Sequence, residues 1–282
     1  IDLARARLAD RLPAAVFVGG SNGNFAEFNR NRPEIEKMDG VCYTINPQIH
    51  SFDERSLIEN IEAQKDTLLT ARSFCGKLPV SISSVTLKPP FNVVATEQGG
   101  LVDPDVLPPA VDPRQMSLFG AVWTAGSIGA LAAGGAASVT YYETTGWKGL
   151  LENSEGCQLP NRFLSVPGMI FPVYWIFDFL TEYKGAQVLG FSSSSPLRCG
   201  GLALRKGNRT MVLAVNYQPA GQAIRLCCLP GNQAAIRRLN QDTARMASTD
   251  PDAFRSYSTM VKIDEGKLVL TLQPYESVLV EI

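Results

Sequence analysis

The feature that most constrains this chain is the alternation of strand-like and helix-like segments over its first two thirds. Apolar, β-branched runs predict four strands, at 14–21, 40–46, 79–87 and 136–143. A clear helical pattern occupies 51–76, where Ser51 and Glu54 have capping-box spacing and Gly76 follows the last apolar position. Strands that alternate with helices pair in parallel through right-handed crossovers. The pattern therefore predicts a parallel α/β sheet.

The remaining connections of this part carry weaker signals. Residues 24–38 predict a loop with short helical turns, and 172–184 predict a further helix. A Pro-rich loop at 88–111 leads to a helix at 112–134, with Asp112 as its N-cap and Pro113 at its first position. No charged residue occurs from 115 to 142, so a membrane span is an alternative. The glycines and the β-branched run that follows favour a buried helix.

Doubly wound sheets and (β/α)8 barrels both fit this alternation. The barrel is favoured because polar residues follow every predicted strand: Asn22, Asn24, Asn46, Gln48, His50, Thr86, Lys88, Asn92, Glu143 and Trp147. In a barrel these positions share one rim, where active sites lie. Only four strands are visible where a barrel needs eight, and the chain opens without Met inside an amphipathic pattern. We therefore expect the second half of a TIM barrel, with its N-terminal half missing or replaced by a self-association partner.

After about residue 185 the helical signals end. Residues 200–218 predict a hairpin that turns at 206–208, and 223–231 and 267–282 predict further strands. Short strands with turn signals and no convincing helix predict an antiparallel β-sandwich. The expected domains are a half-barrel at 1–185 and a β-sandwich domain at 186–282, with a structural role for the second.

Charge and cysteine content narrow the function. The net charge is −1 with both signs interspersed, which does not indicate a nucleic-acid partner. The six cysteines form no CxxC pair and the chain has one histidine, so neither a disulfide framework nor a metal site is predicted. Reduced thiols favour a cytoplasmic protein. The glycine-rich stretch 19–23 matches no nucleotide-binding motif, and no cofactor is expected.

Three rim residues are candidates for catalysis. Glu143 ends the fourth predicted strand, where Tyr and Trp neighbours would desolvate its carboxylate and suit it to acid–base work. His50 lies between a strand end and a helix start, and histidine exchanges protons near neutral pH. Lys88 could stabilise negative charge on a reacting oxygen. The alternatives are a salt-bridged rim carboxylate, a loop histidine bonded to backbone and a solvated lysine.

Neutral and aromatic rim residues are candidates for binding a polyol ligand: Asn22, Asn24, Asn46, Gln48, Tyr142 and Trp147. Side-chain amides supply uncharged hydrogen bonds, and an aromatic ring offers a flat apolar floor for a sugar. Loop asparagines also form turns, and either aromatic residue could instead belong to the core. These alternatives stay open at the level of sequence.

Several long blocks together resemble the D-apionate lactonase family: NFAEFNRNRP, YTINPQIHSFDERSLIE, VTLKPPFN, VDPRQMSLFGAVWTAGSIGALAAGG, SVTYYETTGWKG and PGMIFPVYW. The similarity runs from about residue 12 to the C-terminus. It implies a longer protein with a glycosidase-like barrel and a C-terminal β-domain. It also implies a hydrolase whose small-molecule partner is a sugar lactone, D-apionolactone, which it opens to D-apionate in pentose catabolism. The resemblance carries no assigned catalytic residues.

One mechanism is consistent with both lines of inference. Water attacks the lactone carbonyl, Glu143 or His50 takes its proton, and the other member protonates the leaving ring oxygen. Lys88, or the amides of Asn22 and Asn46, stabilise the oxyanion. The alternative is a TIM-barrel glycoside hydrolase, which needs two paired carboxylates where only Glu143 directly follows a strand. A third hypothesis is a sugar-binding protein without turnover.

Overall fold

The computed structural model describes residues 1–90 and 103–282. It divides the chain into two compact units, Ile1–Gly100 with Ala130–Tyr142 and Leu101–Gly129 with Glu143–Ile282, which are described separately. The predicted loop at 88–111 falls partly on residues 91–102, and Asn92 therefore lies outside the described residues.

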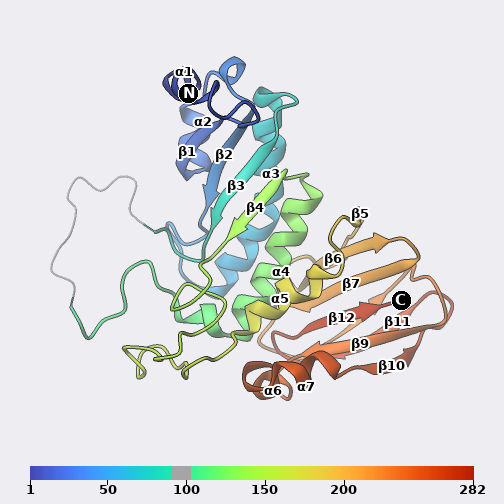
Figure 1. Cartoon of the computed structure of the whole chain (residues 1–282). Coiled ribbons are helices and arrows are strands. Elements are labelled where there is room, and N and C mark those ends of the chain that lie inside the picture. The colour runs from blue at the N-terminus through green and yellow to red at the C-terminus, as the bar shows by residue number, and fades with distance from the viewer. Residues whose placement is uncertain (91–102) are drawn as a thin grey trace. The chain divides into compact units, whose positions relative to one another are not determined.

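The first unit is built on a parallel four-stranded sheet in the order β1-β2-β3-β4. Its strands are coloured blue to green in Figure 1, and their bounds are Val18–Asn24, Gly40–Ile45, Val80–Val85 and Ser138–Tyr141. One register row runs across the whole sheet, from Gly20 to Cys42, Ser81 and Ser138. The predicted parallel pairing is confirmed.

The two faces of this sheet differ in chemistry. One face buries Val41, Tyr43 and Ile82, none of which has any exposed surface. Burial raises the pKa of Tyr43 to about 12, and its hydroxyl lies 2.8 Å from that of Thr67 on α3. The other face carries small polar side chains, among them Ser83. A sheet with one apolar and one polar face buries only the first against its helices.

Helix α3 (Glu54–Cys75) covers the apolar face with a stripe of leucine and isoleucine side chains. Its N-cap is Asp53, whose carboxylate accepts the Ser56 amide at 2.9 Å, so the expected Ser51 capping box is wrong. Asp53 lies one position before the helix and has extended backbone angles, which suit an N-cap. The helix ends at Gly76, as predicted.

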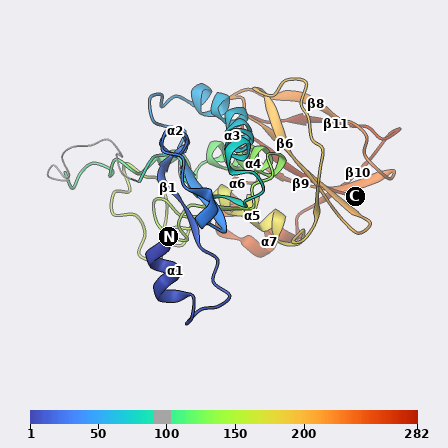
Figure 2. The same ribbon diagram turned by 90° about the horizontal axis from the view of Figure 1, so that it is seen from above.

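The N-terminal part of this unit holds short helices: α1 (Asp2–Leu8), α2 (Phe25–Arg30) and a 3₁₀ turn, η1 (Ile35–Lys37). Figure 2, the view from above, shows α2 beside β1. The short turns predicted for 24–38 are confirmed. Strand β1 begins four residues later than position 14, and the backbone just before it is held by Asp39, which accepts the Phe17 amide at 2.8 Å.

The apolar segment after residue 111 starts with a 3₁₀ turn, η2 (Pro113–Met116), which Asp112 caps through the Arg114 amide. The α-helix itself, α4 (Leu118–Ala133), begins later than predicted. The Asp112–Pro113 signal therefore marks the turn and not the helix. Within the described residues, no helix is both long and apolar enough to cross a membrane.

The C-terminal part of the second unit contains two antiparallel sheets, drawn in yellow to red in Figure 1. The larger has the order β10-β9-β12-β7-β6-β5, with bounds Thr259–Lys262, Gln233–Leu239, Ser277–Glu281, Arg209–Asn216, Cys199–Lys206 and Gln187–Leu189. The smaller pairs β11 (Leu268–Leu272) with β8 (Gln222–Leu226). The β6–β7 hairpin turns at Gly207, which has φ of 60°, as predicted.

One apolar core joins the two sheets. It contains Val212 and Ala214 from β7, Val278 and Val280 from β12, and Leu270 from β11. Alternate residues of β11 are buried and exposed, as expected where one face of a strand meets a core. The predicted antiparallel β-domain is confirmed.

Three helices belong to the same unit: α5 (Pro172–Thr181), α6 (Ala244–Thr249) and α7 (Pro251–Ser256). The first confirms the helix expected near 172–184. The prediction of no helix after residue 185 is wrong, because α6 and α7 follow β9. Each has only six residues, too few for a periodic pattern, and Asp250 caps α7 through the Ala253 amide.

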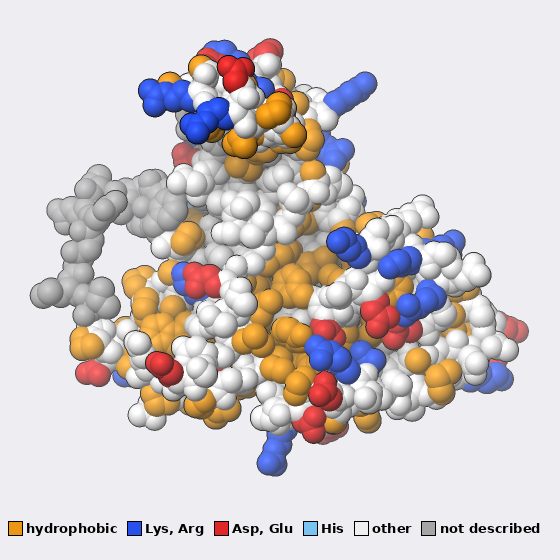
Figure 3. All heavy atoms as spheres, viewed as in Figure 1, with side chains coloured by type: hydrophobic (Ala, Val, Ile, Leu, Met, Phe, Trp, Pro, Cys, Tyr) orange, Lys and Arg blue, Asp and Glu red, His pale blue; other side chains and the backbone are white. Residues whose placement is uncertain are grey.

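Charges on the face drawn in Figure 3 are mixed in sign over the C-terminal β-domain. The second unit also contains ion pairs, such as those of Arg209 with Glu182 and Glu281.

Candidate active site

The carboxyl ends of β1 to β4 share one edge of the parallel sheet. Asn24 ends β1, Asn46 follows β2, Thr86 follows β3 and Tyr142 follows β4. Because parallel strands all run in one direction, residues far apart in the sequence meet at this edge. The predicted rim residues of the first unit, from Asn22 to Lys88 and Tyr142, lie in or after these strands, whereas Glu143 and Trp147 belong to the second unit.

A hydrogen-bonded chain of side chains connects β2 to the segment after β3. The side-chain amide of Asn46 donates to the Thr86 hydroxyl at 2.8 Å. The Thr44 hydroxyl donates to the side-chain carbonyl of Asn46 at 3.3 Å. The Thr86 hydroxyl in turn donates to the backbone carbonyl of Lys88 at 2.7 Å. Asn46 is buried, with 9% exposure. Its amide therefore holds the backbone of Lys88 through Thr86.

Two further features fix this segment. The Gln48 amide, 2% exposed, donates to the Leu87 carbonyl at 2.9 Å. Pro89 directly follows Lys88 and restricts it to extended backbone angles. Lys88 itself is half-buried. Asn46 and Gln48 thus have structural partners, which leaves a direct role of either in substrate binding as a prediction.

The other predicted residues of the first unit are more open. His50 is exposed, in the connection between β2 and α3. Asn22 is exposed within β1. Asn24 is half-buried, and its side-chain carbonyl caps α2 by accepting the Ala26 amide at 3.1 Å. A cap is the ordinary role of an asparagine at this position.

The end of β4 has an unusual backbone. Tyr142 has φ of 48°, in the left-handed region that bulky residues rarely adopt. Its amide donates to the Val85 carbonyl at 3.3 Å, and its ring lies 5.6 Å from that of Tyr141. The strand therefore ends at Tyr141, two residues earlier than predicted. Strained residues of this kind occur preferentially at functional sites.

Glu143 opens the next segment and belongs to the second unit. Its Oε1 lies 2.6 Å from Nζ of Lys148, and 57% of its side chain is exposed. The expectation of a desolvated carboxylate is wrong, because the side chain reaches solvent and a lysine. The salt-bridged alternative is found, with Lys148 as the partner.

Residues 143–151, here called the Glu143 loop, are closed by backbone hydrogen bonds. The Glu143 amide donates to the Lys148 carbonyl at 2.9 Å, and the Leu150 amide donates to the Thr144 carbonyl at 3.0 Å. A Cβ on Gly149 would lie 2.6 Å from the Thr145 backbone, so only glycine fits there. The same pair of residues, Glu143 and Lys148, is joined through both backbone and side chains.

Side chains outside the Glu143 loop hold it in place. The buried Gln115 amide donates to the Gly149 carbonyl at 3.0 Å. The indole N–H of Trp147 donates to Sγ of Cys157 at 2.9 Å. This bond anchors one edge of the Trp147 ring, which is half-buried.

A buried carboxylate strengthens the segment that follows. Glu152 is 3% exposed, its Oε1 accepts the Asn153 amide at 2.9 Å, and its Oε2 accepts the Ser165 hydroxyl. These bonds connect residues 152 and 165 across the long connection that precedes α5. The connection is therefore organised, although it contains no regular element before α5.

The described residues also contain carboxylates and thiols that bear on other chemistry. In that part of the chain, no group of three or more His, Cys, Asp or Glu side chains could hold a metal ion. Cys42 faces the polar side of the sheet, and burial raises the pKa of its thiol, which keeps it protonated. The first unit offers the imidazole of His50 and the amine of Lys88, and the second unit offers the carboxylate of Glu143 and the amine of Lys148. Each of these groups can take part in proton transfer.

Sequence reasoning did not find Lys148, Gln115 or Cys157. Lys148 had one usable signal: an opposite charge five residues after Glu143, across a turn that contains Gly146. Gln115 and Cys157 act from outside the Glu143 loop, and only the tertiary structure brings them to it.

The parallel sheet with its helices, followed by antiparallel β-sheets, defines a TIM-barrel-like glycosidase fold with a C-terminal β-domain. Within this class, the chain belongs to the D-apionate lactonase family. The model of that family's TIM barrel domain matches residues 2–185, and the model of its C-terminal immunoglobulin-like domain matches residues 196–280. A comparison with curated protein sequences finds no match.

Solved structures confirm the fold. A 4-O-α-L-rhamnosyl-β-D-glucuronidase from Fusarium oxysporum 12S matches with a TM-score of 0.60 and 15% identity, covering 100% of this chain and 63% of its own. A GH39 β-xylosidase from Caulobacter crescentus matches with a TM-score of 0.57 and 13% identity, covering 100% and 60%. The chain thus spans about three fifths of the length of these two enzymes. At such identities the likeness concerns the fold alone.

Proposed function

We propose that this protein is a sugar lactonase that hydrolyses D-apionolactone to D-apionate in pentose catabolism. The observation that carries the proposal is membership of the D-apionate lactonase family over both domains, residues 2–185 and 196–280. The fold is compatible with it, because TIM-barrel rims support many hydrolytic chemistries. The expected location is the cytoplasm.

The proposed reaction needs a general base, a general acid and a group that stabilises the oxyanion. Water adds to the lactone carbonyl carbon, the carbonyl electron pair moves to oxygen, and a general base takes the water proton. The tetrahedral intermediate then collapses, the bond to the ring oxygen breaks, and a general acid protonates that oxygen. Glu143 and His50 supply the two proton transfers, and Lys88 stabilises the oxyanion.

Substrate contacts in this proposal come from neutral and aromatic residues of the rim. Asn22 and Trp147 offer an amide and an indole face to a polyol. Asn24, Asn46, Gln48 and Tyr142 complete the predicted set, and the first three also have the structural bonds described above. Their contribution to binding is a prediction that substrate affinity would measure.

The test compares purified protein on D-apionolactone, other aldonolactones and a panel of nitrophenyl glycosides. Lactone hydrolysis without glycoside hydrolysis supports the proposal, and the reverse identifies a glycoside hydrolase. Sugar binding without turnover identifies a binding protein. Glu143→Gln and His50→Asn should each lower kcat by about 10²–10⁴-fold.

The matched control for Glu143→Gln is Glu59→Gln on α3. Glu59 is also exposed and pairs with a basic residue, Arg55, at 2.8 Å. We expect this control to keep the full kcat. Unchanged kcat in both Glu143→Gln and His50→Asn would remove these residues from the mechanism.

We further propose that β1 and β4, the two outermost strands of the parallel sheet, pair with other strands. A closed barrel needs eight strands, and this sheet has four among the described residues. Unpaired edges recruit strands from any available source, here the N-terminal half of the same protein or another copy. Light scattering on residues 1–282 alone should show self-association, which a monodisperse monomer would contradict.

A further inference from the structure

We propose that Glu143 is the general base of the reaction and that Lys148 is the residue that positions it. This inference rests on the proposed function and deepens it, because the mechanism above leaves base and acid unassigned between Glu143 and His50. The geometry of the Glu143 loop decides between them.

The ion pair of Glu143 is the first step. Its side chain is 57% exposed and its Oε1 lies 2.6 Å from the Lys148 ammonium. An ammonium only donates hydrogen bonds, so Glu143 faces it as the acceptor of the pair. An ionised carboxylate accepts a proton and cannot donate one. Glu143 therefore takes the proton from water.

The second step concerns the two carboxylate oxygens. Lys148 bonds Oε1, and no other basic side chain of the described residues forms an ion pair with Glu143. Fixing Oε1 restricts the rotation of the side chain and directs Oε2 to one position. A base must be held close to its productive geometry, and a 1 Å error can cost about 10²-fold in rate.

The third step is the rigidity of Lys148 itself. Its carbonyl accepts the Glu143 amide at 2.9 Å, so backbone and side chain hold the same partner. Gly149 next to it has no room for a Cβ, and the Gln115 amide bonds the Gly149 carbonyl. Only 33% of the Lys148 side chain is exposed. A lysine held in this way orients its partner, which a freely solvated lysine does not do.

The principal experiment is Lys148→Met, which keeps the length of the side chain and removes the charge. We expect kcat on the lactone to fall about 10–100-fold with KM within about twofold, because orientation of the base matters only for the chemical step. Lys148→Arg should keep kcat within about threefold of the native value, since the guanidinium can still bond Oε1.

A double mutant separates positioning from a general structural effect. If Lys148 acts through Glu143, Lys148→Met in a Glu143→Gln background should cost nothing further, within about twofold. Additive losses would overturn the inference. The matched control is Lys262→Met, which removes a lysine of β10 whose Nζ lies 3.9 Å from Oδ1 of Asp264, and it should keep full activity.

Chemical rescue tests the base assignment directly. Formate added to Glu143→Ala at neutral pH should restore about tenfold of the lost kcat, because a small carboxylate can take the water proton in place of the side chain. No rescue of Glu143→Ala, or rescue of His50→Ala alone, would overturn the assignment.

The outcomes separate this inference from the proposed function. If the native protein does not hydrolyse lactones, both the proposed function and this inference are wrong. A native lactonase that loses activity in Glu143→Gln, but keeps its kcat in Lys148→Met, removes only the role of Lys148. Circular dichroism on each variant excludes a loss of folded structure as the cause.

Discussion

Two glutamates of the second unit each bond a basic side chain at almost the same distance. Glu143 lies 2.6 Å from Lys148, and Glu276 lies 2.8 Å from Arg238. Their surroundings differ: 57% of the Glu143 side chain is exposed, whereas Glu276 has no exposed surface. Water screens the first pair more strongly than the second, so nearly equal distances correspond to different interaction energies.

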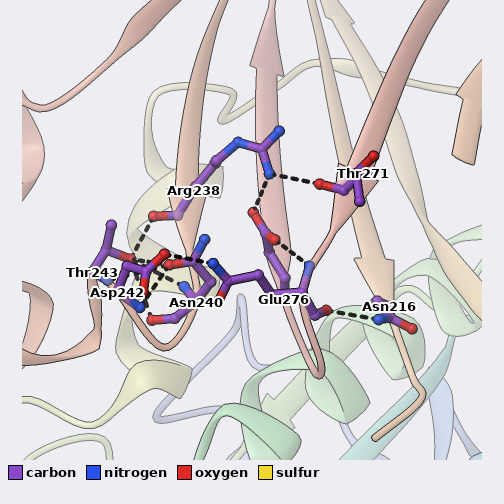
Figure 4. A network of polar contacts seen from close by, with 8 residues as sticks. Asn216, Arg238, Asn240, Asp242, Thr243, Thr271 and Glu276 are labelled. Carbon is purple, nitrogen blue, oxygen red and sulfur yellow. Dashed lines mark hydrogen bonds and ion pairs between the residues drawn. The ribbon is translucent and has the colours of Figure 1, made fainter. Parts of the chain in front are cut away.

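Glu276 belongs to the network drawn in Figure 4. Its Oε2 accepts the Gln273 amide at 2.6 Å, and its backbone carbonyl accepts the Asn216 amide at 2.9 Å. Arg238 also donates to the Thr271 carbonyl at 3.1 Å. Every part of Glu276 is therefore bonded within the β-domain. The comparison indicates that the buried pair, Glu276 with Arg238, stabilises the fold, whereas the exposed carboxylate of Glu143 is accessible for chemistry.

The largest expected effect on stability comes from breaking the buried pair. Glu276→Ala leaves the Arg238 guanidinium, 26% exposed, without its carboxylate and the Gln273 amide without its acceptor. Removing one partner of a buried pair typically costs 3–5 kcal/mol, and partial exposure of Arg238 places the expected loss near the lower end, about 3 kcal/mol. Urea unfolding followed by circular dichroism measures it.

A double variant sharpens the same prediction. Replacing both partners, as in Arg238→Met with Glu276→Leu, leaves no uncompensated charge and should recover most of the loss. Full additivity of the two single changes would show that the pair is not coupled. A loss below about 1 kcal/mol in Glu276→Ala would mean that this network behaves like a surface pair.

The sequence predicted the parallel sheet and the β-domain because both depend on local patterns that tertiary structure did not override. Residues 40–46 form a buried run, and β2 occupies all but the last of them. The 206–208 turn needed a left-handed residue and had Gly207. Patterns of this kind are complete within one segment of the chain.

The first and last residues of strands and helices were less predictable, since they depend on contacts with other parts of the chain. Strand β4 stops at Tyr141 because Tyr142 turns into the left-handed region, for which a tyrosine gives no signal. Helices α6 and α7 were missed because six residues carry no period. At the N-terminus of α3, two nearby residues could serve as caps, and only the structure shows that Asp53 does.

The polar residues of the candidate site were found by position, but their partners were not. Asn46 was predicted at the sheet edge, where it lies, yet its bond to Thr86 joins residues 40 positions apart. Glu143 was expected beside aromatic groups and instead pairs with Lys148. A strand pattern places a residue at an edge, whereas long-range contacts decide its environment.

The smallest expected effect on the free energy of unfolding comes from breaking the exposed pair, Glu143 with Lys148. Lys148→Met should change the free energy of unfolding by no more than about 0.5–1 kcal/mol, because exposed ion pairs contribute little after screening and side-chain entropy are counted. The same variant is expected to lower kcat 10–100-fold or so, by the positioning argument above. Parallel urea unfolding and lactone assays on one preparation give both numbers. A loss of stability as large as that of Glu276→Ala would mean that Lys148 serves the fold, because a pair that water screens cannot supply so much energy by Coulomb attraction alone.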